Sequence, residues 1–406
     1  MIEIKNVTMI DGTRKDLTIP SSKPQVIDAT GLTLFPALVD PHVHFRTPGD
    51  EYKENWETAA KACIAGGVTT VFDMPNTNPT TTTKKNLEDK KRIIDEQLKK
   101  VGIPLRYHLY FGADRKHFDE IAAVKDQVVG IKVFMGSSTG ELLMEDDSSL
   151  HAIFALAKAH SLVIAIHAED EKWIQQRKKQ FPFLDYAEHS RLRSPEVAAK
   201  ALEKAINLAK IYKTPLYVLH LSTKEELALI KSAKEAGISV FAETTPHHLF
   251  LSTDDYAKWG AKIQVNPPLR DPENHKALFD AIHEGIIDTV GSDHAPHTEE
   301  EKRLPYGKAP SGIPAIELTL PLLLNAYHEG LLTLPLITSL THSRALEIFH
   351  LPEPNDVVLV DLQKTKTVED SLLHTKCGWT PYAGRKLKGW PVYTILQGEV
   401  FHVEAL

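Results

Sequence analysis

Two histidines stand one residue apart directly after an apolar run, in the stretch DPHVHFR at residues 40–46. The side chains of an extended strand alternate between its two faces, so His42 and His44 point the same way. Neutral imidazole nitrogen is a common ligand for zinc and similar ions. The pair therefore indicates half of the coordination shell of a metal ion.

Four more ionisable residues end other apolar runs, namely Lys132, His167, His220 and Asp293. One histidine at a strand end is more often a structural residue than a ligand, but four histidines and an aspartate at equivalent positions indicate a metal site. This set exceeds the four ligands of one tetrahedral ion, so we predict two ions. Sites with two ions share a hydroxide that is nucleophilic at neutral pH.

Lys132 is the only charged residue in the apolar stretch GIKVFMG at residues 130–136. A lysine inside a protein must lose its charge, find a partner or react. The alternative is that its stem lies along a rim while the ammonium reaches solvent. A neutral amine that adds carbon dioxide becomes a carbamate, and this anion could bridge two cations.

The elements that position these residues repeat as strand, loop and helix eight times between about residues 36 and 350. Most of the strands are continuous apolar runs, as expected of a parallel sheet covered on both faces. Helical segments such as 55–67 and 194–212 separate them. The predicted strands are residues 34–45, 68–75, 106–112, 129–135, 162–169, 215–222, 239–248 and 288–297.

Eight such repeats favour an α/β fold of the (β/α)8 TIM-barrel type, in which active groups lie at the carboxyl ends of the strands. An open doubly wound sheet is the alternative, and the absence of a GxGxxG motif after the first strand disfavours its dinucleotide-binding form. Short alternating strands at both ends of the chain lack a helical period. We therefore predict a small β-sandwich from residues 1–35 and 355–406, with a catalytic barrel over 36–354.

Composition excludes several classes of function. The chain has 406 residues and a formal net charge of -7, with scattered basic residues, which argues against nucleic acid as a partner. It contains no apolar run long enough to cross a bilayer, and its start does not resemble a signal peptide. The two cysteines form no CxxC pair, which argues against a thiolate zinc site and fits a cytoplasmic location.

The motifs DPHVHFRTPG, DMPNTNP, NPPLR and SDHAPH occur in this order along the chain. Together with the histidines of HAED and HLST and the lysine of GIKVFMG, they resemble the cyclic amide branch of the amidohydrolase superfamily, and within it the dihydroorotase family. The resemblance covers nearly the whole chain. It implies two zinc ions bridged by carbamylated Lys132, with these further ligands: His42, His44, His167, His220 and Asp293.

The resemblance also implies an activity, the reversible cyclisation of N-carbamoyl-L-aspartate to L-dihydroorotate in pyrimidine biosynthesis. Asp293 would be both a ligand and the catalytic group that carries a proton to the leaving nitrogen. Arg46 lies two positions after His44, where its guanidinium can bind a substrate carboxylate through two hydrogen bonds. Other expected substrate contacts are Asn76, Asn266, His297, Pro310, Ser311 and Gly312.

The sequence does not decide the roles of some residues or exclude every alternative function. His247 and His248 are interpreted as structural or as supports of ligands, and His294 as a non-ligand because it alternates away from Asp293. The segment 136–147 is either a loop near the substrate or an ordinary surface connection. A dihydropyrimidinase or allantoinase is the alternative enzyme, although these relatives generally lack an arginine at position 46. An inactive, metal-free structural partner is a further alternative, and a homo-oligomer is possible.

Overall fold

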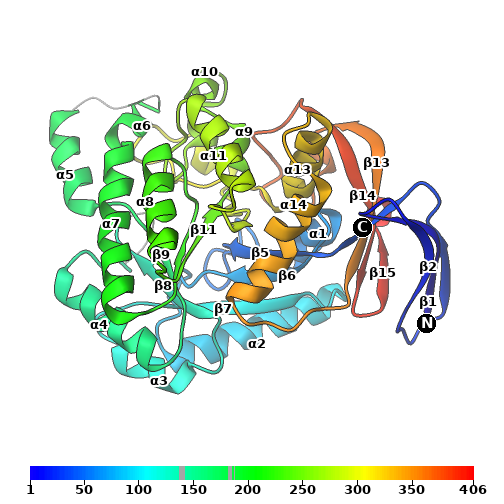
Figure 1. Ribbon diagram of the computed structural model, residues 1–406, viewed down its shortest axis with the longest axis horizontal. Coiled ribbons are helices and arrows are strands. Elements are labelled where there is room, and N and C mark those ends of the chain that lie inside the picture. Colours follow the sequence, from blue (N-terminus) through cyan, green and yellow to red (C-terminus); the bar gives the residue numbers. More distant parts are fainter. Residues whose placement is uncertain (137–141, 182–184, 187) are drawn as a thin grey trace.

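A computed structural model describes the chain except for residues 137–141, 182–184 and 187 (Figure 1). Its centre is a barrel of eight parallel strands, each paired with its neighbours in sequence. The ring is closed by a parallel bridge between Val43 and His294, where the His44 N–H donates to the His294 carbonyl at 2.8 Å. The barrel strands are β5 (Leu38–Val43), β6 (Val68–Asp73), β7 (Arg106–Gly112), β8 (Gly130–Phe134), β9 (Ile164–His167), β10 (Leu216–Val218), β11 (Val240–Thr244) and β12 (Thr289–Val290). The predicted (β/α)8 architecture is confirmed.

Alternation along the strands explains why they read as continuous apolar runs. In β10, Leu216 and Val218 pack outward in the cluster under the helices, whereas Tyr217 points into the barrel. The interior is filled at its amino-terminal end by Phe349, whose ring centroid lies 5.0 Å from those of both Phe72 and Tyr217. The barrel is therefore a packed core, and the candidate ligands collect at its carboxyl end.

Helices cover the outside of the barrel, and most of the longer ones begin at a side-chain cap. Asn55, Thr83, Asp146 and Asp170 each accept a backbone N–H in the first turn of the helix that follows. The helices are α1 (Trp56–Ala65), α2 (Lys84–Val101), α3 (Ile121–Val124), α4 (Asp147–Ala159), α5 (Glu171–Gln180), α6 (His189–Leu192), α7 (Pro195–Tyr212), α8 (Lys224–Glu235), α9 (Pro246–Phe250), α10 (Tyr256–Trp259), α11 (Glu273–His283), α12 (Glu299–Lys302), α13 (Thr319–His328), α14 (Leu334–Thr338) and α15 (Arg344–Ile348). None of the described helices is long and apolar enough to span a membrane.

Strands from both ends of the chain form one mostly antiparallel sheet beside the barrel (Figure 1). They meet where β4 pairs antiparallel with β13, so that Phe35 lies opposite Val358. A core of buried aliphatic side chains from both ends, including Ile4, Leu34 and Leu359, packs on this sheet. The strands are β1 (Ile2–Met9), β2 (Arg14–Ile19), β3 (Gln25–Asp28), β4 (Thr33–Pro36), β13 (Val357–Thr367), β14 (Lys386–Leu396) and β15 (Glu399–His402).

Most predicted strands are longer than those observed, and for three of them the structure shows the reason. Residues 34–45 belong to two strands, because the chain leaves the terminal sheet after β4 and enters the barrel at β5. The predicted strand 239–248 ends at Thr244, and α9 begins at Pro246, a residue whose fixed φ suits the first helical turn. The predicted strand 288–297 contains only two strand residues, since the backbone turns at Asp293 with a φ of +44°.

Candidate metal centre and substrate pocket

The first group of candidate ligands joins the two strands that close the barrel. His42 lies in β5, His44 directly follows it, and Asp293 follows β12. One carboxylate oxygen of Asp293, Oδ1, lies 3.2 Å from Nε2 of His42 and 3.2 Å from Nε2 of His44. The ligand atoms of these three residues fall within 4.8 Å of one another, a spacing that can hold a metal ion.

The second group lies across the barrel mouth. His167 ends β9 and His220 follows β10, and Nδ1 of His167 lies 2.9 Å from Nε2 of His220. Lys132, in β8, is buried with its ammonium 4.4 Å from the Phe134 ring centroid. Both groups line one pocket, together with the predicted contacts Arg46, Asn76, Asn266, Ser311 and Gly312. Its lining includes all six predicted ligands.

Each of three histidines is fixed by an acceptor on the ring nitrogen that faces away from the other ligands. Nδ1 of His42 lies 2.7 Å from Glu243 Oε1, and Nδ1 of His44 lies 2.8 Å from Asn76 Oδ1. Nε2 of His167 lies 2.8 Å from Glu169 Oε2. An acceptor on one nitrogen places the ring proton there and leaves the other nitrogen free to bind a metal.

Burial sets the protonation of these groups. It lowers the pKa of His44 to about 3 and lowers the pKa values of His167 and His220. Burial would raise the pKa of Glu169, but Arg193 and His167 lower it to about 2. Burial also lowers the pKa of Lys132 to about 7. His44, His167 and His220 are therefore neutral at pH 7, as ligands must be, and a substantial share of the lysine is a neutral amine.

Buried carboxylates also hold the backbone of the ligand strand. Oδ1 of Asp73, at the end of β6, accepts the N–H of Phe45 at 2.8 Å. Its other oxygen lies 2.5 Å from the ammonium of Lys90, which reaches in from α2, and both side chains are fully buried. Asp40 accepts the N–H groups of His42 and Ser292 at 3.1 and 3.0 Å, so it ties β5 to the end of β12.

The Arg46 side chain forms one flank of the pocket and is buried. Its Nε donates to the Pro296 carbonyl at 3.0 Å, and its Nη2 lies 3.0 Å from His297 Nε2. The same His297 nitrogen lies 3.1 Å from the Ser311 carbonyl oxygen. The flank is thus a buried cation beside a histidine, which is a suitable arrangement for an anionic group.

The amidohydrolase family model matches residues 33–341, which cover the barrel and its ligands. The chain belongs to the amidohydrolase family. Curated relatives include a dihydroorotase from Methanosarcina acetivorans, 36% identical over 100% of this chain and 88% of that protein. A dihydroorotase from Bacillus licheniformis is 34% identical over 95% and 90% of the two chains. The L-hydantoinase (dihydropyrimidinase) of Arthrobacter aurescens superposes with a TM-score of 0.92 at 28% identity, covering 98% of this chain and 95% of that one.

This amidohydrolase is therefore a hydrolase that acts on cyclic amides, and metal dependence is typical of its family. Its own residues fit a metal, because inward imidazole nitrogens and a carboxylate converge at the barrel mouth. A further sign is His220 Nδ1, which is buried and has no hydrogen-bond partner among the described residues. The three-residue group of His42, His44 and Asp293 satisfies the spacing for one ion directly.

Several supports of the site escaped the sequence analysis, namely Asp40, Asp73, Glu169 and Glu243. Each is an acidic residue within or just after an apolar strand, as in FDM, HAED and FAET, and this pattern was their signal. A buried carboxylate needs a partner, so its presence in such a run indicates a nearby donor. The identity of that donor depends on how the strands are ordered in the barrel.

The remaining predicted residues lie around this centre. Asn266 accepts a hydrogen bond from His189 Nε2 at 2.9 Å, and Pro310 offers its carbonyl to Lys302 at 2.9 Å. His294 points away from the candidate ligands, and its Nδ1 accepts the N–H of Ala315 at 3.1 Å. Residues 137–141 of the segment 136–147 lie outside the described residues.

His247 and His248 are both buried in α9 instead of ending a strand. The two ring nitrogens of His248 meet Thr245 Oγ1 at 2.9 Å and the Pro267 carbonyl at 3.1 Å. Neither ring nitrogen of His247 has a hydrogen-bond partner among the residues that the structure describes. Burial lowers the pKa of His247 to about 4, so its ring is neutral at pH 7.

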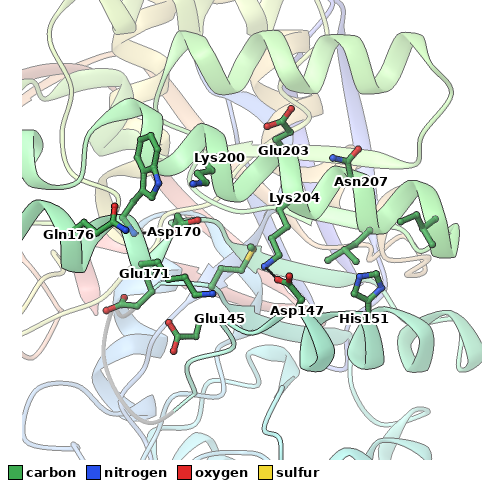
Figure 2. Close-up of a pocket in the computed structure, with 15 residues that line it drawn as sticks. Glu145, Asp147, His151, Asp170, Glu171, Gln176, Lys200, Glu203, Lys204 and Asn207 are labelled. Carbon is green, nitrogen blue, oxygen red and sulfur yellow. Dashed lines mark hydrogen bonds and ion pairs between the residues drawn. The ribbon is translucent and has the colours of Figure 1, made fainter.

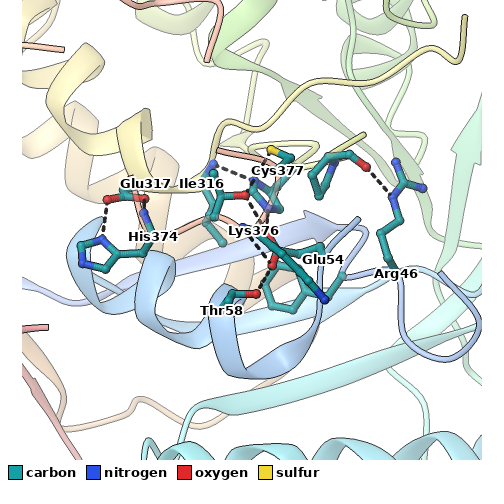
Figure 3. Close-up of polar contacts among 12 residues, drawn as sticks. Arg46, Glu54, Thr58, Ile316, Glu317, His374, Lys376 and Cys377 are labelled. Atoms are coloured by element: carbon teal, nitrogen blue, oxygen red, sulfur yellow. Dashed lines mark hydrogen bonds and ion pairs between the residues drawn. The ribbon is translucent and has the colours of Figure 1, made fainter. Parts of the chain in front are cut away.

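A segment near the carboxyl terminus reaches back to this face of the barrel. Glu54 is fully buried and accepts the Lys376 N–H at 3.1 Å and the Thr375 hydroxyl at 2.5 Å (Figure 3). Trp379 Nε1 donates to the His297 carbonyl at 2.8 Å. The end of the chain thus supports the flank that contains Arg46 and His297.

A larger cavity of about 610 Å³ lies between α4, α5 and α7 (Figure 2). Its lining mixes charges of both signs, and Lys204 and Asp147 form an ion pair across it. None of the candidate ligands lines it. Size therefore does not identify the active site here, and the converging ligands do.

Proposed function

We propose that this amidohydrolase is a cytoplasmic dihydroorotase, which interconverts N-carbamoyl-L-aspartate and L-dihydroorotate in pyrimidine biosynthesis. The observation that carries this proposal is the buried guanidinium of Arg46 beside His297, at the edge of the ligand cluster. A substrate carboxylate would meet this guanidinium in a buried site, where a charge-assisted hydrogen bond is strong, and a cyclic amide without a carboxylate would not use it. The curated relatives named dihydroorotase support the same substrate.

In this proposal Lys132, as a carbamate, would join the candidate histidines and Asp293 in holding two zinc ions. The partly neutral amine of Lys132 supports this modification, since only an uncharged amine adds carbon dioxide. His42 and His44 would hold one ion, His167 and His220 the other. When bound, the ions would polarise the amide carbonyl and lower the pKa of water to near neutrality.

The residues of the chain would divide the remaining work between them. Arg46, His297, Asn266 and the backbone at residues 310–312 would hold the substrate carboxylate and ring, fixing the amide beside the ligand cluster. Asp293 would accept a proton from the attacking water and deliver it to the leaving ring nitrogen. In the biosynthetic direction the same carboxyl would return the proton.

Asn76 has a second role in this proposal. Its Oδ1 accepts from His44 Nδ1 at 2.8 Å, so it orients a ligand as well as lining the pocket. A substitution of Asn76 would therefore change metal binding as well as substrate binding. Arg46 makes no contact with a ligand histidine in the hydrogen bonds described above, so its substitution separates the two effects.

The second candidate is a hydantoinase or dihydropyrimidinase, which the structural match to L-hydantoinase favours. The two candidates differ in whether the substrate has a carboxylate. Purified enzyme is assayed with L-dihydroorotate, dihydrouracil, hydantoin and allantoin. We expect dihydroorotate to be preferred, and a preference for hydantoin or dihydrouracil would replace the proposal with the second candidate.

Arg46→Ala tests the carboxylate contact directly. Loss of two charge-assisted hydrogen bonds, each worth about 1.5–3 kcal/mol, should raise the KM for dihydroorotate at least about 100-fold. Arg46→Lys is the matched control, because it keeps the charge and loses the planar fork. Metal content is measured in each variant, and an unchanged KM in Arg46→Ala with full metal would refute the proposal.

A further inference from the structure

Lys302 is a buried cation next to the pocket that the catalytic scheme above does not use. It ends α12, and only about 2% of the residue is exposed. Its ammonium donates to the carbonyls of Pro310 at 2.9 Å, Gly312 at 3.0 Å and Gln264 at 3.3 Å. Within the described part of the chain, no carboxylate forms an ion pair with it. Burying a lysine against neutral carbonyls alone costs free energy. The benefit must therefore come from fixing the backbone segments that the ammonium contacts.

These carbonyls belong to the backbone that forms or directly adjoins the wall of the substrate pocket. Ser311 and Gly312 line that pocket directly. Gln264 braces the same segment from the other side, since its carbonyl accepts the Gly312 N–H at 2.9 Å and its side-chain amide donates to Ser311 Oγ at 3.0 Å. Lys302 therefore joins two backbone segments that come from different βα units.

The helix that contains Lys302, α12, also contacts His297, which lies beside Arg46 in the flank of the pocket. Glu301, the neighbour of Lys302, lies 3.4 Å from His297 Nδ1 through its Oε2. Its Oε1 accepts from the Tyr52 hydroxyl at 2.9 Å and lies 3.1 Å from the Lys53 ammonium. Adjacent residues of α12 thus fix the histidine beside Arg46 and the backbone opposite it.

We propose that Lys302 is a positioning residue that fixes the pocket wall at residues 310–312 and thereby sets the affinity for the substrate carboxylate. The inference rests on the proposed dihydroorotase function. Lys302 is connected to Arg46 through this wall, because His297 Nε2 lies beside both the Arg46 guanidinium and the Ser311 carbonyl. The side chain points at carbonyls and not into the pocket, so it acts through the wall.

Steady-state kinetics of Lys302→Met on dihydroorotate test this role. The substitution keeps an unbranched side chain that is one heavy atom shorter, and removes the three N–H donors. We expect KM to rise about tenfold while kcat changes less than about threefold, because the ligand cluster is untouched. Metal content and unfolding temperature are measured alongside. Lys308→Met is the matched control, since Lys308 is exposed in the same segment and should leave both constants unchanged.

Gly312→Ala disturbs the same wall independently. Gly312 has a φ of +136°, and a Cβ there would meet the Ala295 carbonyl oxygen at 2.5 Å, so the segment must shift. We expect the same rise in KM with nearly constant kcat. This variant decides the matter if Lys302→Met does not fold.

Turnover of dihydroorotate by the wild-type enzyme is measured first. Its absence would refute the proposed function without refuting the claim that Lys302 fixes the wall at residues 310–312. Where the wild type is active, an unchanged KM in folded, metal-replete Lys302→Met overturns the role of Lys302. A loss confined to kcat overturns it as well. If Lys302→Met is unfolded, an unchanged KM in Gly312→Ala would also overturn the role of Lys302.

Discussion

Glu243 contacts the candidate metal centre without being one of its proposed ligands, and Glu243→Gln is the sharpest test of whether it supports that centre. The carboxylate is fully buried. Its Oε1 lies 2.7 Å from His42 Nδ1 and accepts the His220 N–H at 3.1 Å, while Oε2 accepts the Tyr217 hydroxyl at 2.8 Å. The substitution keeps the shape of this acceptor and removes its charge.

The magnitude follows from these contacts. The side-chain carbonyl of the introduced glutamine can still accept from His42, and the Tyr217 hydroxyl can turn to accept from the new amide, because Thr289 Oγ1 lies 2.6 Å from it. The loss is the charge assistance of two hydrogen bonds, about 1 kcal/mol each. A total of about 2 kcal/mol corresponds to a roughly 30-fold weaker metal affinity, within the range seen for outer partners of metal ligands.

The assay is competition for zinc between the metal-free protein and a chromophoric chelator. Glu226→Gln is the control, since Glu226 is equally buried but caps α8 at Ser222 and Thr223. The metal-free Glu243→Gln protein should unfold at no lower temperature than metal-free wild type, because a buried charge without its cation has been removed. A zinc affinity within about threefold of wild type would refute the reasoning that the charge of Glu243 tunes the site.

Three further outcomes are expected. Asp293→Ala should remain folded and lose most turnover of the preferred cyclic amide; near-normal kcat would remove this carboxyl from proton transfer. Lys90→Met should destabilise the protein by about 3–5 kcal/mol in urea unfolding, because it leaves Asp73 buried without its cation, and a change below about 1 kcal/mol would contradict this. Burial lowers the pKa of Lys302 to about 7 from 10.5, so the unfolded chain binds more protons between these values. Wild type should therefore gain stability relative to Lys302→Met as pH rises from about 7 to 10, and a parallel pH profile for the two proteins would exclude it.

The sequence allowed the barrel to be predicted because each of its strands is an apolar run with a helix after it. Predicted boundaries were wrong where the chain changes direction without a signal in the sequence. Residues 34–45 read as one strand because nothing in the apolar stretch LFPALV shows that the chain changes sheets there. The length of β12 was overestimated because the chain leaves the strand after Val290 and turns at Asp293. The residue type alone does not show whether an aspartate has a left-handed or an extended backbone.

The candidate ligands could be predicted for a different reason. Parallel strands all end at one rim, so histidines at several strand ends must converge even when the order of strands in space is unknown. Their supports could not be assigned in this way. The pairing of Glu243 with His42 depends on closure of the ring, which places β5 beside β12 and so only one strand away from β11.

Backbone strain at this rim shows how the scaffold and the site depend on each other. Arg46, His220 and Asp293 have φ values of +62°, +41° and +44°, which cost about 1–3 kcal/mol each for residues other than glycine. Each left-handed turn directs a side chain that would otherwise continue the alternation of its strand. These conformations persist only if the neighbouring backbone is held firmly.

The buried carboxylates provide that hold. Glu243 accepts the N–H of His220 itself, Asp73 accepts the N–H immediately before Arg46, and Asp40 accepts the N–H immediately before Asp293. A buried carboxylate forms a charge-assisted hydrogen bond with a backbone N–H, about twice as strong as a neutral one. The acidic residues at the strand ends therefore fix the strained turns that aim the candidate ligands and Arg46. A change at one of them should move the position of a functional side chain before it unfolds the barrel.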